Sequence, residues 1–139
     1  MVEFVLVTPV LFMLMLATAE LVRAWTQYST LAHAVRDATR HVAGKAMFGS
    51  TNTVVVTAAL LTEARNLVMY GNTAGTGALR LPGLSAAQIS AAPQNGINVQ
   101  ITANYTYQPL LGGTLPMFGY GTNPSTAFTF TVSSTMAGL

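Results

Sequence analysis

Two histidines and one aspartate have a spacing that could place them on one face of a helix. His33, Asp37 and His41 follow one another at intervals of four residues, close to one helical turn. Imidazole and carboxylate groups bind zinc in proteins, but zinc sites usually take their ligands from more than one element. We therefore expect these three side chains to lie on a solvated helix face and to hold no metal.

Other reactive patterns are incomplete. The glycine-rich segment 71–77 lacks the Gly-Lys-Ser/Thr ending with which a P-loop binds phosphate. A serine hydrolase would need a nucleophile elbow, which the sequence does not contain. The four carboxylates show no spacing typical of an acid–base pair, and without cysteine there is no thiol nucleophile. The sequence predicts that the protein is not an enzyme and has no catalytic residue, cofactor or metal site.

Glu3 has a position that is unusual for a carboxylate, at the edge of a long apolar run near the chain start. At a lipid interface or at a helix N-terminus such a charge is favourable in itself. If the helices instead bundle away from water, the carboxylate needs a cation, because an isolated buried charge is very costly. The nearest cation is an α-amino group, that of Met1 or of a neighbouring chain. Such a pair would fix the axial register of two helices.

Charged residues are rare in this chain of 139 residues, a length that favours one domain or one domain with a tail. Only 7% of the residues are charged and 51% are hydrophobic, whereas about 25% are charged in an average soluble protein. Much of the surface must therefore be covered by something other than water. The net charge of +2 comes from scattered residues and is too sparse for a nucleic-acid interface.

An uncharged run from Phe4 to Ala19, called the apolar run below, has the composition of a membrane segment. As a helix it would span about 24 Å, a little less than the roughly 30 Å hydrocarbon core of a bilayer. A soluble core helix would show a polar face, which this run lacks. A cleavable signal would show a basic residue before the run and a cleavage site after it, and neither pattern is seen here. The residues expected to pack in this part of the chain are Phe4, Leu6, Val7, Pro9, Leu11, Phe12, Leu14 and Leu16.

The helical pattern continues beyond the apolar run without Gly or Pro until Gly44. Apolar residues recur at spacings of three and four, which is typical of one face of an amphipathic helix. This predicts one helix from about Val2 to about Met47, some 65 Å long. The remaining 90 or so residues cannot cover it, so its first half must protrude and be solvated by lipid or by copies of itself. Pro9 is expected to kink or loosen its first turns. The expected buried positions are Leu21, Trp25, Tyr28, Ala32, Val35, Ala38 or Thr39, and Val42, with Arg23, Gln27, Thr30, Asp37 and Arg40 on other faces.

The second half of the chain predicts a small domain of mixed structure. A loop at 49–52 is followed by a helix from about Thr53 to Tyr70, which the pair Gly71-Asn72 would end with a left-handed cap. Segment 79–81 is expected as a short strand, and 85–88 has the form of a capping box. Alternating residues predict two antiparallel strands, 97–107 and 128–133, separated by an irregular segment rich in Gly and Pro.

The expected fold class is therefore α+β. Residues 1–48 form an N-terminal stalk helix, apolar over approximately 1–20, and residues 49–139 form a globular head with one further helix and a short antiparallel sheet. Arg23, Arg36, Arg40 and Lys45 all follow the apolar run, so the positive-inside rule would place the head in the cytoplasm. Its composition, rich in Thr, Asn and Gly, is more typical of an external domain. The conflict disappears if a basic leader preceded Met1 and is removed on the cytoplasmic side, which we expect.

Several blocks of the sequence resemble a known family. The segments 2–11, 19–25 and 34–40, together with 64–72 and 105–110, are similar to those of the TadE-like pilins of type IV (Tad) pilus systems. The likeness covers most of the chain and is most specific in the N-terminal third. The family's mature chain usually begins two residues further upstream of the glutamate than Met1 does here.

The resemblance implies a precursor that prepilin peptidase cuts after a basic leader, with Glu3 as the assembly glutamate. It further implies an inner-membrane pool, pilus assembly machinery as a partner, and an extracellular filament of identical subunits. Two functions from different classes are therefore expected. The first is a structural pilin that polymerises through its N-terminal helix for surface attachment. The alternative is a minor pilin, pseudopilin or membrane-anchored binding module that does not form the bulk of a filament.

Overall fold

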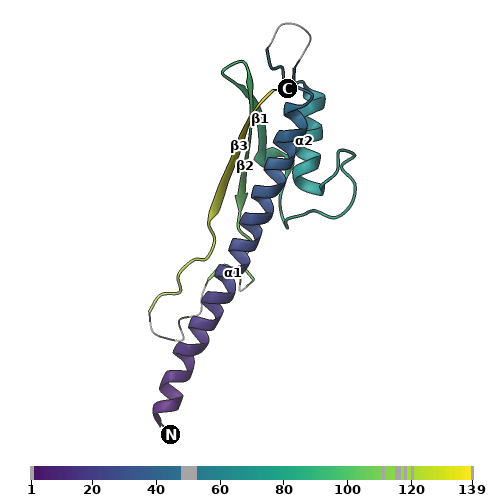
Figure 1. Cartoon of the computed structure of the whole chain (residues 1–139). Helices are drawn as coiled ribbons and strands as arrows, with labels where there is room; N and C mark the ends of the chain where they lie inside the picture. Colours follow the sequence, from purple (N-terminus) through teal and green to yellow (C-terminus); the bar gives the residue numbers. More distant parts are fainter. Residues whose placement is uncertain are drawn as a thin grey trace.

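The computed structural model describes residues 2–47, 53–110, 112–114, 117, 119 and 121–138, and for residues 2, 3 and 6 the backbone only. The predicted loop at 49–52 lies outside the described residues. The elements are α1 (Val2–Ala43), α2 (Ala58–Tyr70), the 3-10 turn η2 (Ala86–Gln88), β1 (Ile89–Gln94), β2 (Asn98–Thr106) and β3 (Thr129–Ala137). They form the predicted α+β fold, a long N-terminal helix with a further helix and an antiparallel sheet gathered at its far end (Figure 1).

Helix α1 is continuous over 42 residues and runs through Pro9, so the expected loosening does not break it. Threonine hydroxyls along the helix bond back to the carbonyl oxygens four residues earlier, as Thr8 does to Phe4 at 2.7 Å and Thr18 to Leu14 at 2.7 Å. These bonds satisfy the hydroxyl groups within the helix itself, so an apolar surrounding does not leave them unpaired. The helix ends at Ala43, four residues earlier than predicted, with a turn at Gly44.

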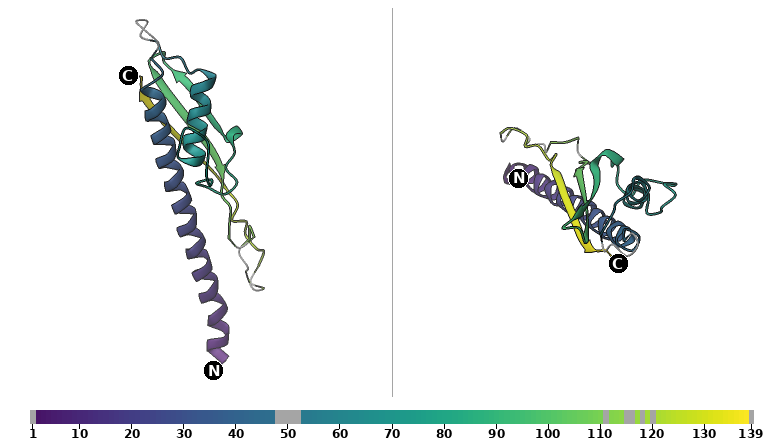
Figure 2. Two further views of the ribbon diagram at one scale, coloured as in Figure 1. Left: turned by 90° about the vertical axis from the view of Figure 1, so that its right-hand side faces the viewer. Right: turned by 90° about the horizontal axis from the view of Figure 1, so that it is seen from above.

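The first half of α1 extends alone. In the views of Figures 1 and 2, none of the other described helices or strands accompanies its N-terminal turns. The second half packs on the sheet and on α2. One helix therefore serves both parts of the molecule, as the length of the predicted helix required.

The sheet has three antiparallel strands in the order β1-β2-β3. The two predicted strands are confirmed, although β3 continues to Ala137. Strand β1 was not predicted, because it contains Pro93 and lacks apolar alternation; it lies at the sheet edge, where proline is tolerated. A three-residue turn, 95–97, joins β1 to β2. Its Asn95 and Gly96 have positive φ, 54° and 73°, a region that Asn and Gly adopt more readily than other residues.

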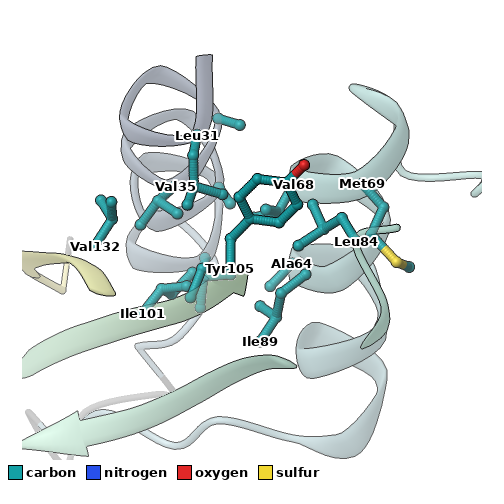
Figure 3. Packing of buried hydrophobic residues seen from close by; sticks show 14 of the residues in the cluster. Leu31, Val35, Ala64, Val68, Met69, Leu84, Ile89, Ile101, Tyr105 and Val132 are labelled. Atoms are coloured by element: carbon teal, nitrogen blue, oxygen red, sulfur yellow. The ribbon is translucent and has the colours of Figure 1, made fainter. Parts of the chain in front are cut away.

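One face of the sheet carries the core. Alternate residues of β2 are buried, namely Val99, Ile101, Ala103 and Tyr105, and both helices cover this face. Figure 3 shows the side chains of α1, α2 and the sheet meeting there. Burying a large apolar side chain contributes roughly 1.5 to 3 kcal/mol, so this contact holds the head on the stalk helix. The α1 residues that are fully buried in it include Leu31, Val35, Ala38 and Val42.

The predicted ends of α2 are partly confirmed. Gly71 has φ 81° and its N–H bonds to the Leu67 carbonyl at 3.0 Å, as the expected left-handed cap requires. The start is later than predicted, because Val54 instead forms an isolated bridge with Met47. Segment 79–81 is not a strand; the Arg80 N–H bonds to the Met69 carbonyl at the end of α2. The capping box at 85–88 is present.

Candidate functional site

The apolar run is bare in this structure. The helical region Val7–Ala43 is long and apolar enough to cross a membrane, and only 11% of its most apolar window is buried. The core helix of a soluble protein would be mostly buried, so the length, composition and exposure of this surface suit a cover of lipid or of another chain. The large apolar side chains exposed within it are Phe4, Val5, Val7, Val10, Leu11, Phe12, Leu14 and Met15.

The predicted packing residues are thus distributed over several sides of α1. Five of them are exposed: Phe4, Val7, Leu11, Phe12 and Leu14. Pro9 and Leu16 are half-buried, and the side chain of Leu6 is outside the described residues. Met1 and the side chain of Glu3 also lie outside them. Their pairing stays a prediction.

The apolar face predicted for the middle of α1 was wrong. Leu21 and Trp25, expected to face the core, are 70% and 71% exposed, and Tyr28 is 38% exposed. The inward positions are taken instead by Glu20, Ala24 and Gln27, followed by Leu31. Gln27 had been expected on another face. The buried face is displaced from the apolar one because two polar side chains point inward.

These inward polar residues are bonded to the end of β2. Glu20 is only 6% exposed. Its carboxylate accepts a hydrogen bond from the Tyr107 hydroxyl and another, at 2.9 Å, from the backbone N–H of Leu110. The Tyr105 hydroxyl donates to the Pro82 carbonyl at 2.9 Å and lies 3.2 Å from the side-chain oxygen of Gln27. This cluster fastens the head to α1 just above the apolar run.

The electrostatics of the cluster keep the tyrosines neutral. Burial, and after it the hydrogen bond to the Glu20 carboxylate, raise the pKa of Tyr107 to about 12, against a smaller opposite effect of Arg23. Burial likewise raises the pKa of Tyr105. At neutral pH both hydroxyls are therefore donors, as the carboxylate and carbonyl acceptors require. Sequence reasoning missed this cluster, because its members are up to 90 residues apart and no local spacing indicates them.

The histidine series does not form a shared site. His33 and Asp37 are exposed, as expected, whereas His41 is half-buried and its Nε2 lies 2.8 Å from Glu63 Oε2 on α2. Lys45 Nζ lies 2.9 Å from the same oxygen, and these two partners lower the pKa of Glu63. Over the described part of the chain, no group of three or more His, Cys, Asp and Glu side chains is placed to hold a metal ion.

Comparisons with known proteins give one match. Residues 1–40 match the family model described as TadE-like protein. No curated protein and no solved structure matches the chain. The matched segment contains the apolar run and Glu20, and it ends within α1. Residues 1–40 of this chain are therefore similar to the TadE-like family, and the match does not extend to the head.

Proposed function

We propose that the protein is a structural subunit of an extracellular type IV pilus of the Tad kind, which polymerises through α1 and serves surface attachment. One observation carries the proposal: the same continuous helix is buried in the head over its second half and bare and apolar over its first half. The TadE-like match falls on this helix. A rigid helix of this kind fixes the head at a constant height above the surface that covers the apolar run.

Before assembly, the apolar run lies in the inner membrane. Its length suits the hydrocarbon core, and a basic leader ahead of it would hold the chain in the orientation that places the head outside. Prepilin peptidase removes that leader, and the pilus machinery then transfers the subunit from lipid to the growing filament. In the filament, neighbouring copies replace lipid around the apolar run. Each large apolar side chain that stays covered keeps roughly 1.5 to 3 kcal/mol relative to exposure to water.

The head suits the outer wall of such a filament. After Arg65, the only charged residue in the sequence is Arg80. Polar side chains of the exposed strand faces are mainly Thr, Ser, Asn and Gln, which are solvated without net charge. Heads of this composition can be packed closely without like-charge repulsion.

The test removes the carboxylate near the chain start. We expect Glu3→Ala to abolish filaments in material sheared from the cells, because the buried N-terminal cation loses its partner, while the chain stays in the membrane fraction with a folded head. Asp37→Ala is the control, since it removes an exposed carboxylate higher on α1 and should leave filaments unchanged. Normal filament yield from Glu3→Ala would contradict the proposal. A wild-type chain found only in membranes, or only in traces in filaments of another protein, would favour the minor pilin or binding module instead.

A further inference from the structure

The apolar surface of α1 continues beyond the apolar run. Leu21, Val22 and Trp25, which follow the run within six residues, are all exposed. Glu20 interrupts the apolar residues in the sequence but not on the surface, because its side chain is buried and its carboxylate is bonded to the head. One side of the helix therefore stays apolar as far as Trp25.

The head adds exposed apolar side chains at the same level. Leu110 follows β2 and Phe128 precedes β3, and both are exposed. Leu110 lines a small hollow together with Leu16 and Ala19, so it lies at the end of the apolar run. In Figures 1 and 2 the described parts of the connection between β2 and β3 extend from the sheet down along α1. The connection thus brings part of the head to the place where the bare half of α1 begins.

We call the surface formed by Trp25, Tyr28, Leu110 and Phe128 the base of the head. Between its aromatic rings lies an apolar hollow of about 300 Å³, lined by Leu21, Ala24, Trp25, Tyr28, Phe128 and Phe130. No charged residue follows Arg80 in the sequence, so the connection between β2 and β3 carries no charge. Tryptophan and tyrosine are enriched where a membrane meets water, because their rings have an apolar body and a polar group. The base of the head has this composition.

The height of the base also suits a membrane surface. Trp25 follows Glu20 by five residues, which is about 7.5 Å along the helix. The polar headgroups add roughly 5 to 8 Å to each side of the hydrocarbon core of a bilayer. When the apolar run lies in the hydrocarbon core, Trp25 therefore lies within the headgroup layer. Leu110 and Phe128 lie at this level or just below it, because they line hollows shared with α1.

A cation lies at the same height on another side of α1. Arg23 precedes Trp25 by two residues, which is about 200° around the helix. Its side chain is half-buried, and its Nε has no hydrogen-bond partner in the described part of the chain. Guanidinium groups bind phosphate oxygens through charge-assisted hydrogen bonds, and phospholipid headgroups supply phosphate at this depth. The helix thus presents an aromatic ring and a guanidinium group to the headgroup layer.

We propose that the base of the head binds the headgroup layer of a phospholipid bilayer, on the side of the membrane where the head lies. This inference rests on the proposed function in one respect, because it requires that α1 spans a membrane before assembly. It goes beyond that function, since it assigns a membrane contact to the head itself. The contact fixes the depth of the chain in the bilayer. Assembly then has to release the base of the head from lipid as well as the apolar run.

Tryptophan fluorescence tests the contact directly, because Trp25 is the only tryptophan of the chain. The full chain is reconstituted in vesicles of phosphatidylethanolamine and phosphatidylglycerol. A nitroxide quencher is placed either near the lipid headgroup or near the end of the acyl chain, and acrylamide is the quencher in the water. We expect the headgroup-proximal nitroxide to quench Trp25 at least twofold more strongly than the deep one, with protection from acrylamide.

Moving the single tryptophan supplies the controls. Trp25→Phe/Leu110→Trp reports on the head and should behave as the wild type does. Trp25→Phe/Ile97→Trp is the matched control, because Ile97 is also exposed and apolar but precedes β2, at the opposite end of that strand from Leu110; acrylamide should quench it and neither nitroxide should. Trp25→Phe/Phe12→Trp marks the apolar run and should be quenched most by the deep nitroxide.

Each other outcome overturns a defined claim. If acrylamide reaches the tryptophans at positions 25 and 110 as readily as the one at 97, while the one at 12 is deep, the head stands clear of the membrane and the inference is refuted. Protection from acrylamide without quenching by either nitroxide would mean that another chain covers the base, which also refutes it. A tryptophan at 12 that is not deep would refute the membrane span, and with it the proposed function. If the Leu110 variant fails to accumulate, Trp25→Phe/Phe128→Trp repeats the test. The expected quenching from a chain that makes no filaments in cells would refute the proposed function alone.

Discussion

The hydroxyl group of Tyr107 donates a hydrogen bond to the buried carboxylate of Glu20, a residue 87 positions earlier in the chain. Glu20 directly follows the apolar run, so this bond lies at the junction of the bare and the covered halves of α1. It fixes the segment after β2 to the helix at the level where the proposed membrane or filament core ends.

Removing this donor should loosen the junction. Tyr107→Phe leaves the buried carboxylate with one hydrogen bond fewer, and we expect a loss of about 1 to 3 kcal/mol in the free energy of unfolding. Urea titration of the detergent-solubilised chain, followed by circular dichroism, measures it. Tyr70→Phe is the control, because Tyr70 is only half-buried and its hydroxyl has no hydrogen bond to a described residue. Equal losses in both variants would show that the hydrogen bond to Glu20 stabilises the fold no more than the Tyr70 hydroxyl does.

The same bond predicts instability in strong base. The pKa of Tyr107 is raised from 10.0 to about 12 in the folded chain, so folding favours the neutral hydroxyl. Its contribution is fully present below pH 10 and is lost as the pH rises from 10 towards 12. Unfolding titrations across that window should show this fall in the wild type and a smaller one in Tyr107→Phe. If the free energy of unfolding fell equally steeply with pH in both chains, Tyr107 would not be the group that titrates in this window.

Replacing two leucines ten positions apart on α1 should affect different properties of the protein. Leu31 is fully buried, and Leu31→Ala should cost about 2 to 5 kcal/mol in the free energy of unfolding, because it leaves a cavity in the core. Leu21 is exposed, and Leu21→Ala should change that free energy by less than about 0.5 kcal/mol. Filament yield should nevertheless fall in Leu21→Ala, because the exposed apolar surface of α1 that other copies are proposed to cover loses a side chain. Unfolding and shearing experiments on both variants separate the two roles.

The ion pairs of Glu63 with Lys45 and His41 predict that the free energy of unfolding falls in acid, the opposite pH direction to that of Tyr107. Hydrogen bonds from Lys45 and then His41 hold the pKa of Glu63 below its ordinary value of 4.5. The stabilisation is therefore present above pH 4.5 and is lost as the pH falls below it. Glu63→Gln should lower the melting temperature only slightly at neutral pH, since the Glu63, Lys45 and His41 side chains are all partly exposed to solvent. It should also flatten the acid limb of the stability profile. An unchanged acid limb would contradict this.

The sequence predicts the regular elements well where one physical signal decides them. The alternation along β2 identifies its buried face, and Gly71 identifies the end of α2 through its left-handed cap. Strand β1 escapes prediction, because Ala91, Ala92 and Pro93 carry no strand signal and the pairing with β2 supplies the structure.

The candidate site shows where periodicity misleads. Leu21, Trp25 and Tyr28 continue the spacing of the core residues above them, so a single row suggests burial throughout. The core needs fewer apolar positions at this level, because Tyr105 and Tyr107 bring hydroxyl groups that require polar partners. Glu20 and Gln27 supply these, and the apolar row is left facing outward. The contacts that decide this join residues far apart in the chain, and local pattern cannot reveal them.

The central claim is that this chain forms filaments through its N-terminal helix. Negative-stain microscopy of material sheared from the producing cells, with mass spectrometry of the N-terminus of this chain in that material, tests it most directly. We expect abundant thin filaments composed mainly of this chain, with a processed N-terminus. A chain confined to the membrane fraction, or present only as a trace in filaments of another protein, would contradict it.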